Sequence, residues 1–215
     1  MEMNDHDLFN SIKSEFKREA IEPAWTYNEY FEKNGFFVIK NIYDTKKLSH
    51  PIPEKKGKYH YWGNEDEFHY EEIEDQVIGS TARYWHPQYR KSHSEIRKII
   101  EMGIGRKLYN TYYYDRFYFA GQELVKHIDR PACEISVSVH IGTNLNEKWP
   151  IFVENPKGKS FSIDLEEGDG LVYKGCHRPH WREKMPGESS DLYYHQIFYH
   201  YVLQDGHRAH FAFDR

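Results

Sequence analysis

Residues 134–141 read Glu-Ile-Ser-Val-Ser-Val-His-Ile, and this stretch decides the fold class of the chain. Apolar and polar residues alternate strictly within it. The apolar members, which share one face, are Ile135, Val137, Val139 and Ile141. A period of two is typical of a β-strand and excludes an amphipathic helix. The stretch therefore predicts a sheet at the centre of the protein.

Further strand-like runs lie on both sides of this stretch. They are residues 108–119, 151–153, 161–165, 171–173 and 193–202. Turn-forming sequences separate them, such as Asn155-Pro-Lys-Gly158 and Glu167-Gly-Asp-Gly170. Short strands at close spacing favour a double-sheet jelly roll of the cupin kind, a double-stranded β-helix. We expect this core at about residues 106–205.

Residues 1–105 predict mainly helical support for the core. Helices are expected at residues 5–20, at residues 27–33 and from residue 92 to a stop at Gly103. Apolar residues recur at helical spacing in the first, Thr26 can cap the second, and Ser92-His-Ser-Glu95 is a capping box for the third. One buried strand is expected at residues 36–40. The fold class is therefore mainly β with flanking helices (α+β), in a single domain over residues 1–215.

Residues 44–75 show no sustained period and carry proline, glycine and dense charge. They predict a long loop, and loops of this length in a compact domain are usually functional or disordered. The aromatic cluster Tyr59-His-Tyr-Trp62 favours a lid over a substrate pocket.

Composition excludes several classes of function. The net charge is −5 with both signs interspersed, so no basic field predicts nucleic-acid binding. The longest apolar runs are far too short to span a membrane, and the acidic start is not a signal peptide. Cys133 and Cys176 are the only cysteines, which fits a reducing compartment. We expect a cytoplasmic protein whose partner is a small molecule or peptide, with no nucleic acid and no membrane.

Three pairs of the form His-x-acid are candidates for metal binding: His69-Tyr-Glu71, His93-Ser-Glu95 and His127-Ile-Asp129. With 14 His and 34 acidic residues, random placement alone gives about two such pairs. His93 and Glu95 fall in an expected helix, where side chains two apart point about 200° away from each other. His69 lies in an acidic stretch that is better explained as a solvated surface.

His127 and Asp129 follow a strand-like run. In extended chain, positions two apart face the same side, so both side chains can point into a barrel mouth. A distant strand must supply the third ligand, and either His177 or His180 can do so. Two imidazoles and one carboxylate form the facial triad that holds non-haem Fe(II) and leaves three positions open.

The order of these motifs resembles a known family. His127-Ile-Asp129, then an alternating strand, then Glu166-Glu-Gly-Asp-Gly-Leu-Val-Tyr173 before a distal His, is similar to the Fe(II)/2-oxoglutarate-dependent dioxygenases, particularly prolyl-4-hydroxylase-like members. The resemblance covers about residues 105–203. In that family the distal His commonly stands in His-x-Arg, which favours His180-Trp-Arg182 over His177.

The resemblance implies a metal and a co-substrate. Fe(II) would be held by His127, Asp129 and His180, with 2-oxoglutarate and O₂ at the open positions. The reaction would hydroxylate a free amino acid, a small molecule or a peptidyl side chain such as proline, with release of succinate and CO₂. Asp129, where halogenating relatives have Gly or Ala, argues against halogenation. The alternatives are a cupin-like metalloenzyme that does not use 2-oxoglutarate and a non-enzymatic β-sandwich binding module.

The anchor for the distal carboxylate of 2-oxoglutarate departs from the family pattern. The family places an Arg or Lys about ten or more residues beyond the distal His, where this chain offers no cation except His195. Arg182 shares strand parity with His180, and a planar guanidinium suits a buried carboxylate. Tyr112 and Tyr114 can donate hydrogen bonds to the same group. The alternative for Arg182 is a surface arginine paired with Glu183.

Overall fold

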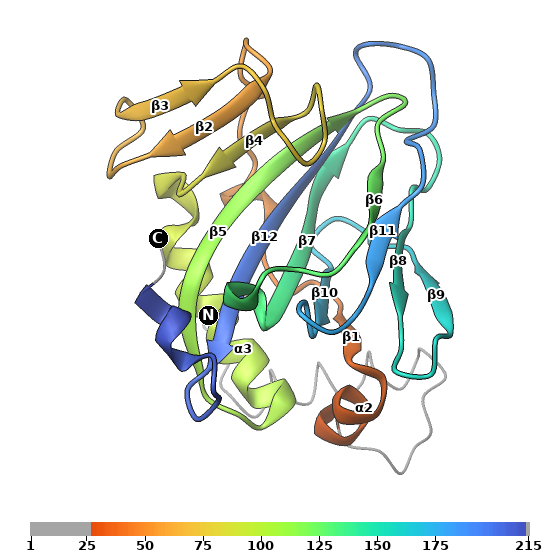
Figure 1. Cartoon of the computed structure of the whole chain (residues 1–215). Helices are drawn as coiled ribbons and strands as arrows, with labels where there is room; N and C mark the ends of the chain where they lie inside the picture. The colour runs from red at the N-terminus through yellow and green to blue at the C-terminus, as the bar shows by residue number, and fades with distance from the viewer. Residues whose placement is uncertain (1–26, 214–215) are drawn as a thin grey trace.

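The computed structural model describes residues 27–213, which form two β-sheets, with one helix behind the larger sheet and another at the lower end of the molecule (Figure 1). In chain order the elements are α2 (Tyr27–Asn34), β1 (Phe36–Ile39), η1 (Thr45–Lys47), β2 (Gly57–Tyr61), β3 (Phe68–Glu71), β4 (Thr81–Tyr84), η2 (Pro87–Tyr89), α3 (Arg90–Ile104), β5 (Leu108–Phe119), β6 (Leu124–His127), η3 (Pro131–Cys133), β7 (Ile135–Thr143), β8 (Ile151–Glu154), β9 (Ser160–Ile163), β10 (Gly170–Tyr173), β11 (His180–Arg182), β12 (Tyr193–Leu203) and η4 (Ala209–Phe213). The expected jelly roll braced by helices is confirmed.

The larger sheet has the strand order β1-β10-β7-β12-β5-β4-β2-β3, and the smaller has the order β6-β11-β8-β9. Two long strands, β5 and β12, pair along almost their whole length at the centre of the larger sheet. All pairings are antiparallel except the one between β2 and β4. The smaller sheet lies to the right of β12 and β7 in Figure 1. Side chains of both sheets, such as Leu124 of β6 and Tyr118 of β5, belong to one buried cluster between them.

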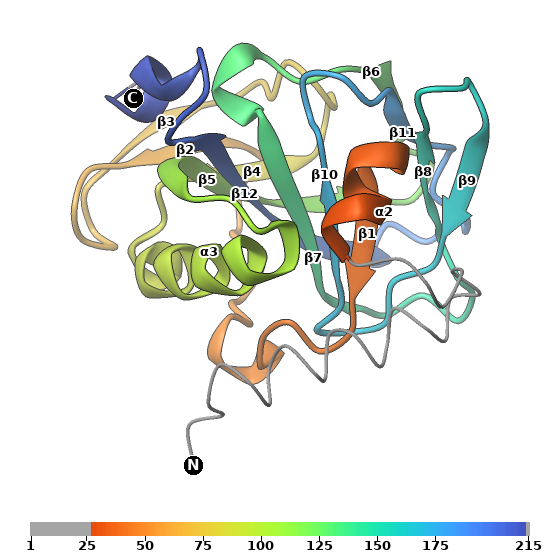
Figure 2. The same ribbon diagram turned by 90° about the horizontal axis from the view of Figure 1, so that it is seen from below.

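The alternating stretch forms β7, and its two faces have different neighbours. Its apolar side chains pack with Ile96 and Ile100 of α3 on the outer face of the larger sheet (Figure 2). Its polar side chains face the smaller sheet and are also buried: Ser136, Ser138 and His140. Strict alternation predicted an apolar face correctly, but here the polar face lines the interior and is not exposed to water.

The Gly168-Asp169-Gly170 turn is fixed by the Asp169 carboxylate. Asp169 Oδ2 accepts hydrogen bonds from Lys40 Nζ at 2.8 Å and from the Glu166 N–H at 2.9 Å. Oδ1 accepts from the Asn41 N–H at 3.2 Å. The carboxylate thereby joins β1 to the turn before β10, which places the chain that follows β10 beside the interior.

Two expectations for the amino-terminal half need correction. Residues 44–75 are not a loop, because Tyr59, Tyr61 and Phe68 pack together within a β2–β3 hairpin that extends the larger sheet. The helical region also contains β4, which no sequence pattern indicated. The expected helix at residues 5–20 and the cap at Thr26 lie outside the described residues.

The capping box at Ser92–Glu95 is also wrong. The turn η2 leads directly into α3 at Arg90, so Ser92 and Glu95 already lie inside the helix. Ser92 Oγ bonds to Tyr89 O at 2.9 Å, and the Glu95 carboxylate accepts from Tyr43 Oη at 2.5 Å. The helix continues through the expected stop at Gly103 to Ile104, and Gly105 follows it in the left-handed conformation at φ 68°.

No helix among residues 27–213 has the length and apolar character needed to cross a membrane.

Candidate metal centre

Residues 127, 129 and 180 meet at the open edge between the two sheets. His127, Asp129 and His180 each offer a ligand atom, and these atoms lie within 4.8 Å of one another. Asp129 Oδ1 lies 3.6 Å from His127 Nε2 and 3.5 Å from His180 Nε2. His180 and Asp129 are largely buried, whereas His127 is a quarter exposed. The geometry is that of a two-histidine, one-carboxylate ligand set.

Strand pairing brings these residues together. β6 ends at His127 and pairs with β11, which begins at His180, so that the two histidines are direct cross-strand partners. Asp129 follows β6, and its N–H donates to Gly175 O at 2.9 Å. Gly175 has to be a glycine, because a Cβ there would overlap Asp129 Oδ2.

Backbone carbonyls fix the orientation of both imidazoles. Nδ1 of His127 donates to Val125 O at 2.8 Å, and Nδ1 of His180 donates to Arg178 O at 2.9 Å. Each ring must therefore be protonated at Nδ1, and the lone pair of each Nε2 is left facing Asp129. Such partners orient imidazole ligands in metalloproteins.

The environment of Asp129 favours its ionised form. Burial raises the pKa of this carboxyl, but the imidazoles of His180 and His127, when they carry a proton on Nε2 as well, more than offset this and hold the pKa well below its usual range. Asp129 Oδ2 also accepts a hydrogen bond from Ser136 Oγ at 2.8 Å.

Residues 72–80, which we call the strap, join β3 to β4 and cross the mouth of the interior. Gln76 Nε2 lies 3.1 Å from His127 Nε2, so its amide donates to the lone pair that a metal would use. Val77 packs in the core between the sheets. Glu74, which is 2% exposed, places Oε1 2.9 Å from Arg116 Nη2.

Arg182 lies inside the protein, two residues beyond His180 on β11, and is 1% exposed. Its guanidinium donates to Trp149 O and lies 3.4 Å from Tyr194 Oη and 3.3 Å from Gln196 Oε1. Within residues 27–213 these partners are all neutral, and Nε is buried without any partner. The alternative of a surface arginine paired with Glu183 is wrong, since Glu183 accepts from Trp181 Nε1 instead.

The other residues predicted for the site are placed differently. Tyr112 Oη contacts Cys133 Sγ at 3.2 Å, and Tyr114 stacks on Phe198 with ring centroids 4.7 Å apart. Neither contacts Arg182. His195 lies on the opposite face of β12, where its Nε2 bonds to Asp115 Oδ2 at 2.7 Å, so the structure does not bring it to the site.

His177 is exposed and stands apart from the ligand set. Sequence reasoning missed Tyr194 and Gln196, which contact Arg182, although their shared parity on a strand pattern was a usable signal. It also missed Ser136.

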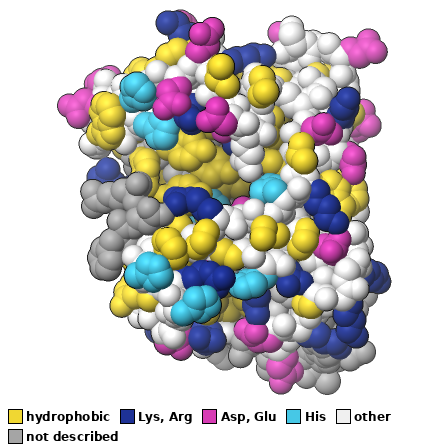
Figure 3. Space-filling model, in the orientation of Figure 1, with side chains coloured by type: hydrophobic (Ala, Val, Ile, Leu, Met, Phe, Trp, Pro, Cys, Tyr) yellow, Lys and Arg dark blue, Asp and Glu magenta, His cyan; other side chains and the backbone are white. Residues whose placement is uncertain are grey.

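A groove of about 700 Å³ lies beneath the β2–β3 hairpin, on the face that Figure 3 shows hollowed and lined by hydrophobic side chains. Trp62, Trp85 and Tyr113 contribute aromatic walls. Trp85 has φ 63°, a left-handed conformation that non-glycine residues rarely adopt. Its ring lies 6.1 Å from that of Tyr112. None of the residues predicted to bind the metal lines this groove.

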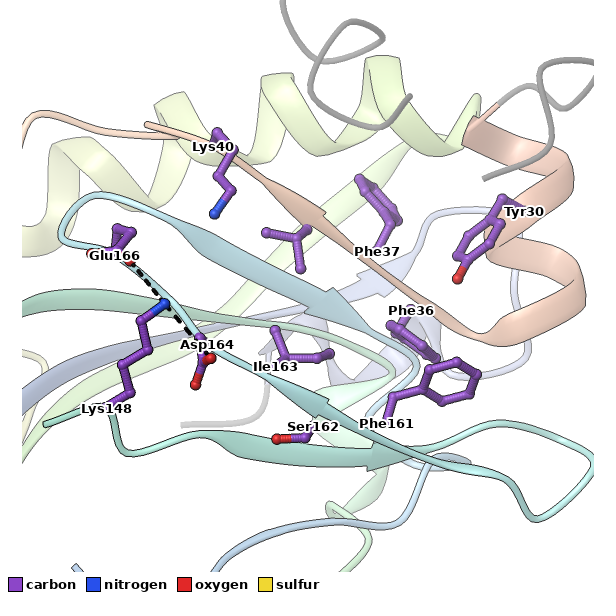
Figure 4. Close-up of a pocket in the computed structure, with 11 residues that line it drawn as sticks. Tyr30, Phe36, Phe37, Lys40, Lys148, Phe161, Ser162, Ile163, Asp164 and Glu166 are labelled. Atoms are coloured by element: carbon purple, nitrogen blue, oxygen red, sulfur yellow. Dashed lines mark ion pairs between the residues drawn. The ribbon is translucent and has the colours of Figure 1, made fainter. Parts of the chain in front are cut away.

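A second pocket of about 380 Å³ lies between α2, β1 and β9, away from these residues (Figure 4). Phe36 and Phe161 form its apolar wall, and Lys148 lies across its rim with ion pairs to Asp164 at 3.7 Å and Glu166 at 3.4 Å. None of the residues predicted for the metal or the co-substrate lines it.

Comparison with known proteins finds likeness in structure but not in sequence. No protein-family model matches the chain, and no curated protein matches its sequence. A prolyl-4-hydroxylase from Pseudomonas putida superposes with a TM-score of 0.56 at 10% identity, over 81% of this chain and 96% of that one.

Two further solved structures agree. An oxidoreductase of the 2OG-Fe(II) oxygenase family from Burkholderia pseudomallei has a TM-score of 0.58 at 11% identity, over 82% of this chain and 89% of that one. A prolyl hydroxylase from Trichoplax adhaerens, in complex with a peptide fragment of the hypoxia inducible factor, has a TM-score of 0.56 at 12% identity, over 90% of this chain and 89% of that one. The chain thus has the jelly-roll fold of the prolyl-4-hydroxylases and the 2OG-Fe(II) oxygenases.

Proposed function

We propose that this protein is a Fe(II)- and 2-oxoglutarate-dependent dioxygenase that hydroxylates its substrate with release of succinate and CO₂. His127, Asp129 and His180 would hold the metal, and Arg182 would bind the distal carboxylate of the co-substrate. The observation that carries the proposal is the buried guanidinium of Arg182, which has no carboxylate partner within residues 27–213. A buried charge without a counter-ion is costly, and an anionic ligand relieves that cost.

The spacing of His180 and Arg182 fits a five-carbon dicarboxylate. Two residues along a strand advance about 7 Å, which is comparable with the distance between the two ends of extended 2-oxoglutarate. Tyr194 and Gln196 stand beside the guanidinium and can complete the carboxylate site. The rings of Trp149 and Tyr194, at 4.5 and 4.6 Å from the guanidinium carbon, exclude water from it.

The interior charges fit the same pair of ligands. Glu74 balances Arg116, which leaves Asp129 and Arg182 as one negative and one positive charge facing the site. A divalent cation alone would leave this buried site with two uncompensated positive charges. A divalent cation together with a dicarboxylate dianion adds no net charge, which is the favourable case in a region of low dielectric.

The residues present therefore fit a metal and 2-oxoglutarate. When bound, Fe(II) with this co-substrate supplies the oxidising chemistry that the protein itself lacks. The protein's own part is geometric. The two Nε2 atoms and the Asp129 carboxylate approach from one side, the backbone carbonyls fix both imidazoles, and Arg182 orients the co-substrate.

The groove supports a substrate larger than a free amino acid. Its volume of about 700 Å³ lies in the range of pockets that bind drug-sized ligands. A peptidyl side chain such as proline, or a small molecule with several rings, fits such a groove and its walls of Trp62 and Trp85. The Trichoplax adhaerens neighbour is a prolyl hydroxylase bound to a peptide fragment, which supports the same class of substrate.

Anaerobic titration with Fe(II) and 2-oxoglutarate tests the proposal. The wild-type chain should give a weak visible charge-transfer band and should release succinate when O₂ is admitted, and His127→Ala should do neither. This control is needed because His207 and His210 can bind metal adventitiously. A wild-type chain without the band would refute the proposal. Tight Fe(II) binding that 2-oxoglutarate leaves unchanged would instead favour a cupin-like metalloenzyme.

A further inference from the structure

We propose that Ser136 and His200 are positioning residues that hold the Asp129 carboxylate in the orientation needed to bind the metal. The inference rests on the proposed function, because it takes Asp129 as a metal ligand. Ser136 comes from the polar face of β7, and His200 from the inward face of the neighbouring strand β12. The two residues are direct cross-strand partners in the larger sheet.

His200, Ser136 and Asp129 form a hydrogen-bonded relay, in which His200 donates to Ser136 and Ser136 donates to Asp129. Ser136 Oγ lies 2.8 Å from Asp129 Oδ2, and an ionised carboxylate can only accept, so the single hydroxyl proton of Ser136 points to Asp129. Ser136 Oγ also lies 3.0 Å from His200 Nδ1. Since the serine proton is already used, His200 Nδ1 must donate to Ser136.

The relay is sealed from water and sterically fixed. Ser136 is 0% exposed and His200 is 2% exposed. The ring of His200 packs on that of Tyr112, with centroids 4.6 Å apart. A Cβ at Gly175 would overlap both Asp129 Oδ2 and Ser136 Oγ, so the absence of a side chain there lets the relay close.

The relay assigns different tasks to the two carboxylate oxygens. Oδ2 is occupied by Ser136, while Oδ1 is the oxygen that faces His127 Nε2 and His180 Nε2. Removing the serine proton would free Oδ2, so that the carboxylate could rotate or present both oxygens. Loss of such a partner of a metal ligand typically costs about 10–100-fold in metal affinity.

The chain offers a matched control for a merely structural role. Ser138 lies two residues further on the same face of β7, is also 0% exposed, and has Oγ 3.5 Å from Tyr173 Oη rather than beside a ligand. Ser138→Ala therefore removes a buried hydroxyl of the same kind without touching Asp129. His200 allows a second control, because an asparagine amide can replace the Nδ1 donor whereas a glutamine amide reaches the position of Nε2.

The experiment measures the dissociation constant of Mn(II) by calorimetry and the melting temperature of each variant in EDTA. Ser136→Ala and His200→Gln should weaken Mn(II) binding about tenfold or more, while Ser138→Ala and His200→Asn should stay within about twofold of wild type. The double variant Ser136→Ala/His200→Gln should bind no more weakly than Ser136→Ala alone, because His200 acts through Ser136.

The outcomes separate the two proposals. If wild type binds Mn(II) and Ser136→Ala binds it equally well, the relay is refuted and the metal site stands. If Ser136→Ala and Ser138→Ala lose affinity in proportion to their loss of melting temperature, the relay is likewise refuted, because its effect is only structural. If wild type and His127→Ala bind Mn(II) alike, the proposed function fails, and the relay fails with it.

Discussion

Arg83 and Arg182 are buried on opposite faces of the β5–β12 pair, and their guanidinium groups have opposite kinds of partner. On the outer face Arg83 is surrounded by acceptors of its own chain, with the Asp115 carboxylate at their centre. On the inner face Arg182 meets only neutral groups within residues 27–213. The comparison shows how to distinguish a buried charge that stabilises the fold from one that is available to bind a ligand. Burial is the same in both cases, so only the partners distinguish them.

The outer group, which we call the Asp115 cluster, consists of Asp115, Arg83, Tyr89 and His195. Arg83 Nε lies 3.0 Å from Asp115 Oδ1, and Tyr89 Oη and His195 Nε2 lie 2.9 and 2.7 Å from Oδ2. Burial raises the pKa of Asp115, but Arg83 and His195 more than offset this and hold the pKa well below its usual range. The charges of the cluster are satisfied internally, so we assign it to the fold.

The largest expected effect is therefore on the outer face. Asp115→Asn leaves the buried Arg83 charge uncompensated and should lower the free energy of unfolding by about 3–5 kcal/mol. Urea unfolding in EDTA measures this. If Asp115→Asn is as stable as wild type, the Asp115 cluster does not stabilise the fold, and the contrast between Arg83 and Arg182 fails.

On the inner face the expected losses are in ligand binding. Gly175→Ala places a Cβ against Asp129 Oδ2 and should weaken metal binding about 10–100-fold. Calorimetric titration with Mn(II) measures the change. Gly121→Ala is a control, since Gly121 has φ 78° but no atom within 4 Å of the added Cβ. Equal losses of metal affinity in the two variants would contradict the steric argument.

Arg182→Met and Arg116→Met compare two buried guanidinium groups of the same interior. Removing Arg182 should raise the apparent Michaelis constant for 2-oxoglutarate about tenfold or more and leave the unfolding free energy unchanged or higher, because no carboxylate loses a partner. Removing Arg116 leaves the carboxylate of Glu74 buried without its partner and should lower the free energy of unfolding. Steady-state succinate release and urea unfolding check the pair. An unchanged Michaelis constant in Arg182→Met would show that another residue binds the distal carboxylate of 2-oxoglutarate.

The last comparison concerns the pH dependence of stability on the outer face. Burial lowers the pKa of His93 to about 3 and that of His86 to about 4. Their unfolded pKa is about 6.5, so the unfolded chain binds more protons below that pH. Stability should fall as the pH drops from about 6.5 towards 4, by about 1.4 kcal/mol per pH unit for each group. Urea unfolding between pH 7 and 5 measures the slope, and His86→Leu should flatten it. An unaltered slope would show that His86 is already charged in the folded state.

The sequence predicted the long central strands because their patterns are strong and local. β7 shows strict alternation, and β5 and β12 are dense in Tyr, Phe and Ile. The strands β2, β3 and β4 were missed because they are short, with four or five residues each, and are held by pairing with one another and with β5. Pairing of that kind leaves no periodicity that a local pattern can show.

The same division applies to the site. The sequence singled out His127, Asp129 and His180 through motif order and strand parity, and the fold places them together. Ser136 and His200 could not be found, because their role depends on cross-strand register and on the proton of one hydroxyl. His195 was a wrong choice. Side chains alternate between the two faces of β12, and because Gln196 points inward, the adjacent His195 points to the outer face.

The cross-strand pairing of His127 with His180 has a consequence for the stability of the whole chain. These residues are 53 positions apart in the sequence, and an ion held by both would close that loop as a covalent bridge does. In the chain-entropy account of disulfides, a closed loop of this length contributes about 4 kcal/mol. Metal loading would thus act as a removable cross-link. A chelator would open it, and the availability of the metal would set how long the folded protein survives.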